Sequence, residues 1–224
     1  QGRDERLLDF SELRQLTQTY LALYAEHAGH PFPQDVRQQL ARAVLAVFAS
    51  WDSAKAREYR KLNGIDSAMG TAVTIQRMVF GNAGGRSGAG VGFTRNPSNG
   101  EPTLWIDFLA NAQGEDVVSG RRNAHGHEAM ADLAPEAWEE LSEATRTLEQ
   151  VFGDMQDFEF TVEDSQLYLL QARSGKRTPL AAARIALDLH EEGLIDRATA
   201  LQRTEALQDA ELSTAHLASD SGAP

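Results

Sequence analysis

The sequence contains no cysteine among its 224 residues. This absence excludes disulfide bonds, thiolate zinc sites and a cysteine nucleophile, and it fits a reducing compartment. Long apolar runs are missing too: the longest, Ala43–Ser50, is far shorter than the ~18 apolar residues that a membrane span needs. The first ten residues lack the basic and then apolar pattern of a signal peptide. We therefore expect a cytoplasmic protein that does not act on membranes.

Positive charge is scarce, because 21 Lys and Arg face 33 Asp and Glu and leave a net charge of −12. An acidic chain repels nucleic acids and anionic membranes, so neither is expected as the main partner. A hydrophobic content of 42% is typical of globular proteins. At ~100–200 residues per domain, the chain forms one large domain or two small ones. It begins with Gln1 rather than Met, and we expect it to be part of a longer protein.

The first third of the chain has helical periodicity. Apolar residues recur on one helical face over Leu13–Tyr24, and the segment His30–Pro33 interrupts this pattern. A second helix is predicted over Val36–Phe48 and a third over Ser53–Leu62. These helices predict a helical subdomain over residues 1–66.

Glycine and β-branched residues dominate the middle of the chain. Strands are predicted over Thr71–Phe80, Val91–Thr94 and Thr103–Leu109. Between the first two lies Gly81–Gly90, in which five of ten residues are glycine. This stretch is neither a P-loop nor a Rossmann fingerprint, since no lysine follows it and it opens no helix. It forms either a phosphate cradle of backbone N–H groups or a flexible hairpin turn.

The last third combines helices with a hairpin. An amphipathic helix is predicted over Pro135–Phe152. Two strands, Asp157–Val162 and Gln166–Gln171, follow around a turn at Glu163–Ser165. A last helix is predicted from Thr178 to Glu192.

These elements predict an α+β fold, in which a helical amino-terminal part is followed by an antiparallel sheet with helices. The sheet and its helices make up a second subdomain over residues 67–204. The polar residues 205–224 are expected to form a flexible tail.

The predicted hairpin carries the polar residues that could do chemistry. Residues two apart in a strand share a face, so Asp157 projects with Glu159 and Gln171 projects with Arg173. In a hairpin centred near Ser165, Glu159 and Gln171 lie opposite one another. Two carboxylates, an amide oxygen and a guanidinium would suit a Mg²⁺–phosphate site. The alternative is a solvated strand face with an incidental salt bridge.

Two other groups of polar residues leave their roles open. His125, His127 and Glu128 could bind a metal, although solvated loop histidines are the more common case. Lys176 and Arg177 either contribute to an anion site or simply precede a helix.

Several motifs resemble the nucleotide-binding domain of pyruvate, phosphate dikinase. They occur in the family's order with compatible spacings: MVFGN at 78–82, SGAGVGFTRNP at 87–97, NAQGEDVVSG at 111–120, DMQDFEF at 154–160 and LLQARSGKRT at 169–178. HPFPQDVRQQL at 30–40 and ASWDSAKAREYRKLNGI at 49–65 resemble its helical part. The resemblance runs from about residue 10 to residue 204. Phosphoenolpyruvate synthase and the rifampin phosphotransferases share the looser pattern, so their activities stay open as alternatives within the enzyme class.

The resemblance implies an ATP-grasp fold, in which two α+β subdomains clamp ATP. Members of the family transfer a phosphoryl group from ATP to a histidine on a separate domain, which then carries it to pyruvate. The implied site residues fall into three sets: Mg²⁺ ligands Glu159 and Gln171; Asp157 and Arg173 as catalytic groups, with Arg173 also holding phosphate; and nucleotide contacts from Gly88, Gly90, Gln76, Met78 and Val79.

Three departures qualify this assignment. Ala89 occupies a position where the family usually has threonine. The phosphate-binding lysine and arginine of the opposing subdomain are not in this sequence, and neither are the phosphohistidine and pyruvate-binding domains. We therefore expect the isolated chain to be inactive. The alternative is a truncated ATP-grasp relative without catalysis, which acts as a nucleotide-binding or regulatory module.

Overall fold

The computed structural model describes residues 8–118 and 126–207. It divides the chain into two compact units, Gln1–Gln76 and Arg77–Pro224, called unit 1 and unit 2 below. Helices and one antiparallel sheet confirm the predicted α+β class. The sequence predicted a subdomain boundary between residues 66 and 67, whereas the two units divide after Gln76. The predicted boundary stays a prediction.

Unit 1 consists of helices at the predicted places. An Asp9–Glu12 capping box starts the first helix, and Gly29 ends it in the left-handed conformation with a φ of 71°. Asp35 and Ser53 cap the next two helices with their side chains. The elements are α1 (Phe10–Ala28), α2 (Val36–Ser50), α3 (Ala54–Leu62) and a 3₁₀ turn (Ser67–Met69).

The strand predicted over Thr71–Phe80 is wrong, because the structure describes this segment as irregular. Ile75 is 67% exposed and Met78 is 62% exposed, whereas Val79 is buried. β-branched residues favour a strand only where a partner strand and a packing surface are present. This segment pairs with none of the strands in the described part of the chain.

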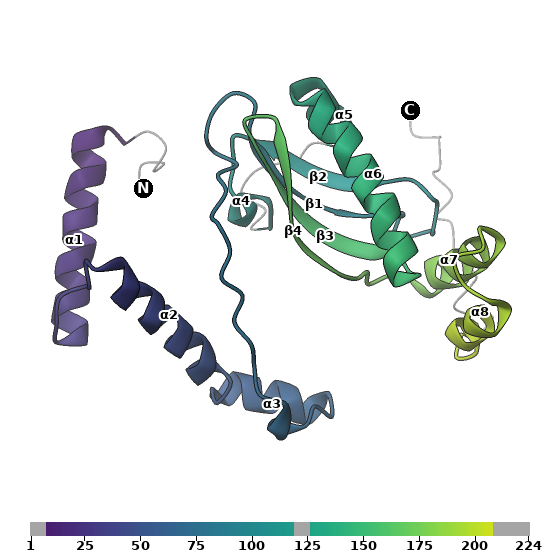
Figure 1. Ribbon diagram of the computed structural model, residues 1–224, viewed down its shortest axis with the longest axis horizontal. Coiled ribbons are helices and arrows are strands. Elements are labelled where there is room, and N and C mark those ends of the chain that lie inside the picture. The colour runs from purple at the N-terminus through teal and green to yellow at the C-terminus, as the bar shows by residue number, and fades with distance from the viewer. Residues whose placement is uncertain (1–7, 119–125, 208–224) are drawn as a thin grey trace, which may run out of the picture. The chain divides into compact units, whose positions relative to one another are not determined.

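Unit 2 is built on a four-stranded antiparallel sheet in the order β2-β1-β3-β4 (Figure 1). The two outer strands each follow an inner strand along the chain, so both pairs are hairpin-like. The bounds are β1 (Gly88–Phe93), β2 (Trp105–Ala110), β3 (Gln156–Glu163) and β4 (Gln166–Ser174).

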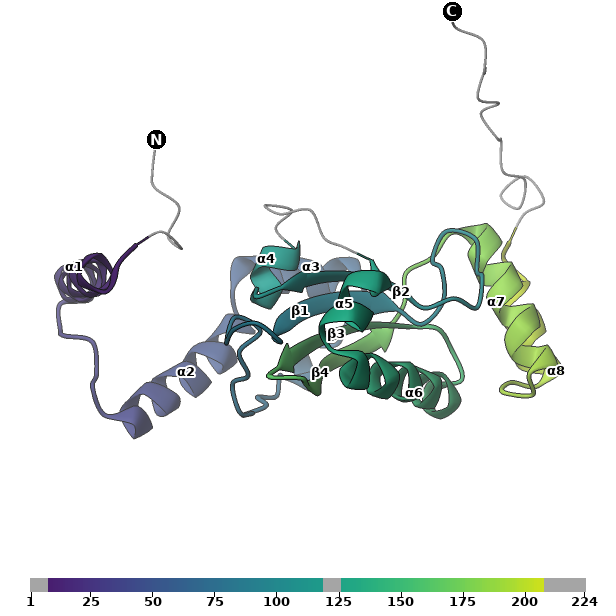
Figure 2. The same cartoon turned by 90° about the horizontal axis from the view of Figure 1, so that it is seen from above.

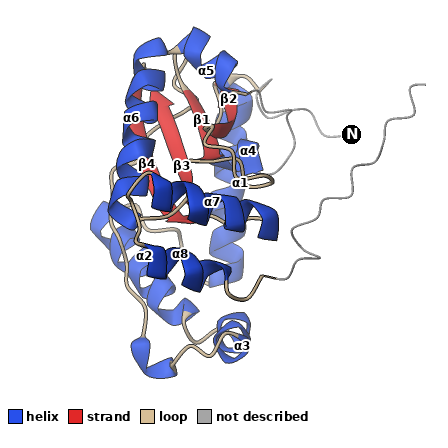
Figure 3. Cartoon of the chain, turned by 90° about the vertical axis from the view of Figure 1, so that its right-hand side faces the viewer, coloured by secondary structure: helices blue, strands red, loops and turns tan. Residues whose placement is uncertain are grey.

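Five helices accompany the sheet in the described part of unit 2, and α6 coincides with its predicted range. Figure 3 shows α7 and α8 as neighbouring helices. The sequence interpretation missed α8, although Asp196 caps it by accepting the backbone N–H of Thr199. The bounds are α4 (Gly114–Val118), α5 (His127–Leu133), α6 (Pro135–Phe152), α7 (Pro179–Glu191) and α8 (Arg197–Thr204).

The core of unit 2 lies between one face of the sheet and helices α5 and α6. Phe108, Phe158 and Phe160 are fully buried there, and the rings of Phe108 and Phe160 stack at 6.1 Å. Figure 2 shows α6 along this side of the sheet and α4 on the other side. On the opposite face, α4 packs against one end of the sheet, where Ala89 and Leu109 are buried.

The glycines of β1 make room for these aromatic rings. A Cβ atom at Gly88 would collide with the ring of Phe108, and one at Gly90 would collide with the ring of Phe160. Neither glycine has a positive φ, so the reason for glycine here is space rather than backbone freedom. The glycines of β1 therefore leave room for the rings of Phe108 on β2 and Phe160 on β3.

Gly90→Ala should lower the free energy of unfolding of unit 2 by about 1–3 kcal/mol, because overpacking forces the ring and the backbone apart. Gly85→Ala is the matched control: an added Cβ there meets nothing within 4 Å, so the change should stay within about 0.5 kcal/mol. Urea unfolding measures both. Adding Phe160→Leu should recover part of the loss, and independent effects of the two substitutions would contradict the packing account.

A buried arginine joins the sheet to two helices of unit 2. Arg95 is 3% exposed and donates to Glu149 on α6 at 2.8 Å and to Glu192, just after α7, at 2.6 Å. Burial acts to lower the pKa of Arg95, but the hydrogen bonds and charges of Glu149 and Glu192 outweigh it and raise the pKa above its ordinary value. Thr94 also donates to Glu149, so the carboxylate is well satisfied.

None of the helices in the two described stretches combines the length and the hydropathy that crossing a membrane requires.

Candidate functional site

The sheet face opposite α6 carries two rows of side chains across the strands. The first row runs from Asp107 through Val91 and Glu159 to Gln171. The second row, two residues along each strand, consists of Trp105, Phe93, Asp157 and Arg173. Adjacent strands lie ~4.8 Å apart, so neighbours within a row are in reach of one another.

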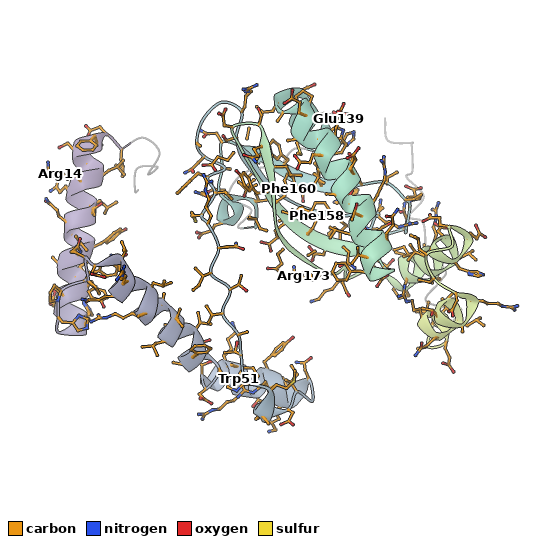
Figure 4. All side chains as sticks on the ribbon, in the orientation of Figure 1. Arg14, Trp51, Glu139, Phe158, Phe160 and Arg173 are labelled. Carbon is orange, nitrogen blue, oxygen red and sulfur yellow. The ribbon has the colours of Figure 1, made fainter. Side chains whose placement is uncertain are left out.

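Asp157, Glu159, Gln171 and Arg173, the hairpin cluster, are thus brought together as predicted. Glu159 is the register partner of Gln171, and Asp157 is the partner of Arg173. The alternate residues Phe158 and Phe160 point toward α6 into the core (Figure 4). The geometric prediction from residue spacing is therefore confirmed, whereas the chemical roles stay predictions.

A β-bulge produces this register, which the sequence interpretation did not foresee. The turn is a tight one at Asp164 and Ser165, both with positive φ, so Glu163 pairs with Gln166. An uninterrupted ladder would set Glu159 opposite Leu170 and turn Gln171 toward the core. The ladder shifts by one residue beyond Phe160, and this bulge returns Gln171 to the open face.

An ion pair links the two strands of the hairpin cluster. The Nε–H of Arg173 donates to Asp157 Oδ2 at 2.8 Å, with side chains 61% and 13% exposed. The hydrogen bond from Arg173 to Asp157, together with the charge of that carboxylate, raises the pKa of Arg173 above its ordinary value. Asp157 therefore bonds to one edge of the guanidinium and leaves its outer edge facing solvent.

The cluster offers hard oxygen donors for a cation. Glu159 supplies a carboxylate and Gln171 an amide oxygen on adjacent strands. Across residues 8–118 and 126–207, no group of three His, Cys, Asp or Glu side chains is placed to hold a metal by itself. Mg²⁺ usually keeps several waters and takes substrate phosphates as further ligands. The residues present therefore fit a magnesium ion that arrives with a phosphate ligand.

Gly88 and Gly90 lie inside β1, between β2 and β3, rather than in an open loop. The loop before them is fastened to two other segments. Ala112 donates its backbone N–H to Gly81, and Ser165 donates its backbone N–H to Arg86. Residues 81–87 thus form a turn that is anchored to other segments. Its flexibility and the phosphate contact by Gly88 and Gly90 stay predictions.

The predicted adenine contacts lie in the irregular segment before β1. Gln76 is the last residue of unit 1, whereas Met78 and Val79 belong to unit 2. Gln76 and Met78 are exposed and Val79 is buried. Their contact with adenine stays a prediction.

Asp107 is a polar residue of the open face that the sequence interpretation missed. It is exposed on the edge strand β2 and shares a row with Glu159 and Gln171. Its alternation with the buried Ile106 and Phe108 was the available signal. We add its carboxylate to the candidate site.

The histidine group and the basic pair that the sequence also suggested are only partly described by the structure. His125 lies outside the described residues, and the ring of His127 stacks on Trp138 at 5.6 Å. Arg177 pairs with Asp154, which leaves Lys176 as the exposed member of the basic pair.

Comparison with known proteins gives one consistent family. The model of the pyruvate phosphate dikinase AMP/ATP-binding domain matches residues 32–128 and 122–193. "Pyruvate, phosphate dikinase 2" of Zea mays is 50% identical over 198 residues, which cover 88% of this chain and 22% of the relative. "Pyruvate, phosphate dikinase 1, chloroplastic" of Oryza sativa subsp. japonica is 51% identical over 198 residues, 88% of this chain and 21% of the relative.

The chain thus spans about a fifth of the length of these curated relatives. The family model nevertheless matches well over half of the chain, including β1 to β4 and the hairpin cluster. This chain belongs to the pyruvate phosphate dikinase AMP/ATP-binding domain family.

Proposed function

We propose that unit 2 is the Mg·ATP-binding part of a pyruvate, phosphate dikinase-like phosphotransferase. One observation carries the proposal: two adjacent strands present Asp157, Glu159, Gln171 and Arg173 together on an open sheet face. A carboxylate, an amide oxygen and a guanidinium at this spacing match a metal-bound polyphosphate better than any single polar row would.

Each residue of the hairpin cluster has a distinct role in this proposal. Glu159 and Gln171 hold Mg²⁺, which when bound neutralises phosphate charge and orients the phosphate oxygens. Asp157 holds the Nε edge of Arg173 at 2.8 Å. Among the described residues no partner is recorded for the terminal nitrogens of Arg173, so its fork can receive a phosphate.

Arg173 would then stabilise the charge that develops on the transferred phosphoryl group. Its hydrogen bond to Asp157 is already made without a ligand, so little reorganisation is required on binding. Asp107 lies at the far end of the Glu159 row, two strands from Glu159, and adds negative charge to the same sheet face.

The whole reaction requires parts that lie outside this chain. In the proposed enzyme an ATP-grasp clamp closes on ATP, the phosphoryl group passes to a histidine of another domain, and pyruvate becomes phosphoenolpyruvate. The opposing subdomain would supply further cationic phosphate ligands. The cytoplasmic location stays a prediction, and the word "chloroplastic" in the name of the rice relative describes that relative.

Binding of Mg·AMP-PNP to this chain tests the proposal. We expect Mg²⁺-dependent binding with a dissociation constant above about 1 µM, because the phosphate ligands outside the chain are missing. Calorimetry with Mg²⁺ and with EDTA measures it. Glu159→Ala should weaken binding at least ~10-fold, while Arg86→Ala, before β1 and beside the turn of this hairpin, should not.

Two results would contradict this account. Submicromolar affinity would contradict the view that the chain holds only part of the site. A lack of any Mg²⁺-dependent binding at millimolar nucleotide would contradict the proposed function and support a relative without catalysis.

A further inference from the structure

The ion pair in the hairpin cluster is too exposed to fix its own geometry. The side chain of Arg173 is 61% exposed, and solvent-exposed ion pairs contribute little to holding a structure. The pair also lies near the end of the sheet, one register step from the last partners, Gln156 and Ser174. Strand ends fray unless another interaction holds them. Contacts at the strand ends can therefore help to hold Asp157 and Arg173 in register, beside the ladder that pairs them.

A second, better shielded pair lies at this end of the hairpin. Arg177 donates through its two terminal nitrogens to both carboxylate oxygens of Asp154, at 2.6 and 2.8 Å. The side chains are 15% and 20% exposed. Asp154 stands just before β3, and Arg177 stands just after β4. The pair therefore joins the start of one strand to the exit of the other.

Backbone contacts connect this pair to the sheet. The N–H of Gly175 donates to Met155 at 3.0 Å and continues the ladder past Ser174. The Nε–H of Arg177 donates to the carbonyl of Gly175 at 3.0 Å. Arg177 thus bonds to both chain segments, and its separation from Asp154 fixes the separation of the strands.

The pair lies beside helices α7 and α8. With Ala182 and Ala186 of α7 and Arg203 of α8, it lines a cavity of about 230 Å³. Arg203 donates to the carbonyl of Gly153 at 2.8 Å and adds a contact on the same side. Nε and both terminal nitrogens of Arg177 each donate one hydrogen bond within the protein.

We propose that Asp154 and Arg177 are positioning residues for the candidate nucleotide site: their bidentate pair holds the ends of β3 and β4 together and thereby holds Arg173 against Asp157. The inference rests on the proposed function for its catalytic meaning. Its structural content, that one pair sets the geometry of the other, can be measured without nucleotide.

The Nε–Hε NMR signal of Arg173 in the full chain reports that geometry, because Nε is the donor to Asp157. Arg173→Lys assigns the signal, and Asp157→Asn gives its position without the ion pair. Arg177→Met should move the signal most of the way toward the Asp157→Asn position. Arg177→Lys, which keeps the charge but loses the fork, should give an intermediate shift.

Leu141→Ala separates positioning from general loss of stability. Leu141 is fully buried in the core on α6, so its truncation destabilises unit 2 without touching the strand ends. Its Arg173 signal should stay at the wild-type position. An unchanged Arg173 signal in Arg177→Met would overturn the proposal. If the methionine variant fails to fold, an unchanged signal in both Arg177→Lys and Asp154→Asn would overturn it.

Nucleotide titration of the same variants distinguishes the two ideas. If Arg177→Met shifts the Arg173 signal and weakens Mg·AMP-PNP binding at least ~10-fold, both are supported. If the signal shifts but even the wild-type chain shows no Mg²⁺-dependent binding, the positioning role holds and the proposed function fails.

Discussion

Replacing Arg95 by alanine should lower the free energy of unfolding of unit 2 by about 3–5 kcal/mol, the usual effect of removing one partner of a buried ion pair. Arg95 is 3% exposed and makes hydrogen bonds to Glu149 and Glu192. Glu149 is itself 9% exposed, so its carboxylate would remain buried, with Thr94 as its one side-chain donor among the described residues. The contact between α6 and the end of α7 would also be lost.

Hydrogen exchange of β3 backbone amides, combined with urea, measures the opening of unit 2 specifically. Arg184→Ala is the matched control, because the ion pairs of Arg184 with Glu101 and Asp188 are longer, at 3.8 and 3.6 Å, and its side chain is 44% exposed. Its effect should stay below about 1 kcal/mol. A loss of similar size in both variants would show that Arg95 acts only as a surface charge.

The sequence was a good guide to elements whose pattern is local. The helix Pro135–Phe152 combines a proline at its start with one apolar stripe, and its structural bounds are the predicted ones. The hairpin of β3 and β4 is also local, since its turn and its alternating residues lie within twenty positions of one another. Spacing alone therefore predicted that Glu159 faces Gln171.

Features that depend on distant partners could not be predicted in this way. Arg95 makes hydrogen bonds to residues 54 and 97 positions away in the sequence. The FTRNP motif around Arg95 does not indicate that Glu149 and Glu192 are those partners. The failure over Thr71–Phe80 has the same origin, because strand propensity does not reveal whether a partner strand is present.

The register of the hairpin cluster shows how a correct prediction can rest on an incomplete reason. Symmetry about Ser165 set Glu159 opposite Gln171, but the turn is one residue tighter than that symmetry requires. The extra residue, Leu170, restores the match through a bulge. Bulge positions depend on packing against neighbouring strands, so the sequence alone offered no means of placing this one.

In the longer protein to which the chain is proposed to belong, Glu159→Ala and Arg173→Ala should each reduce turnover at least ~10²-fold without unfolding unit 2. The Arg173→Ala variant lacks the cation that acts on the transferred phosphoryl group, and the Glu159→Ala variant lacks an oxygen ligand of Mg²⁺. Neither side chain is part of the buried core, so stability should change little. Steady-state kinetics with saturating ATP, inorganic phosphate and pyruvate measure the effect, and circular dichroism checks the fold.

Arg86→Ala supplies the kinetic control, since Arg86 is also an exposed arginine with a carboxylate neighbour, Asp164, at 4.0 Å. It lies beside the turn of the same hairpin, at the end away from the cluster, and should leave turnover within about twofold of wild type. If Arg173→Ala retained turnover close to that of Arg86→Ala, the guanidinium at position 173 would have no part in phosphoryl transfer. The open face of the sheet would then lose its catalytic interpretation, even though its residues are correctly paired.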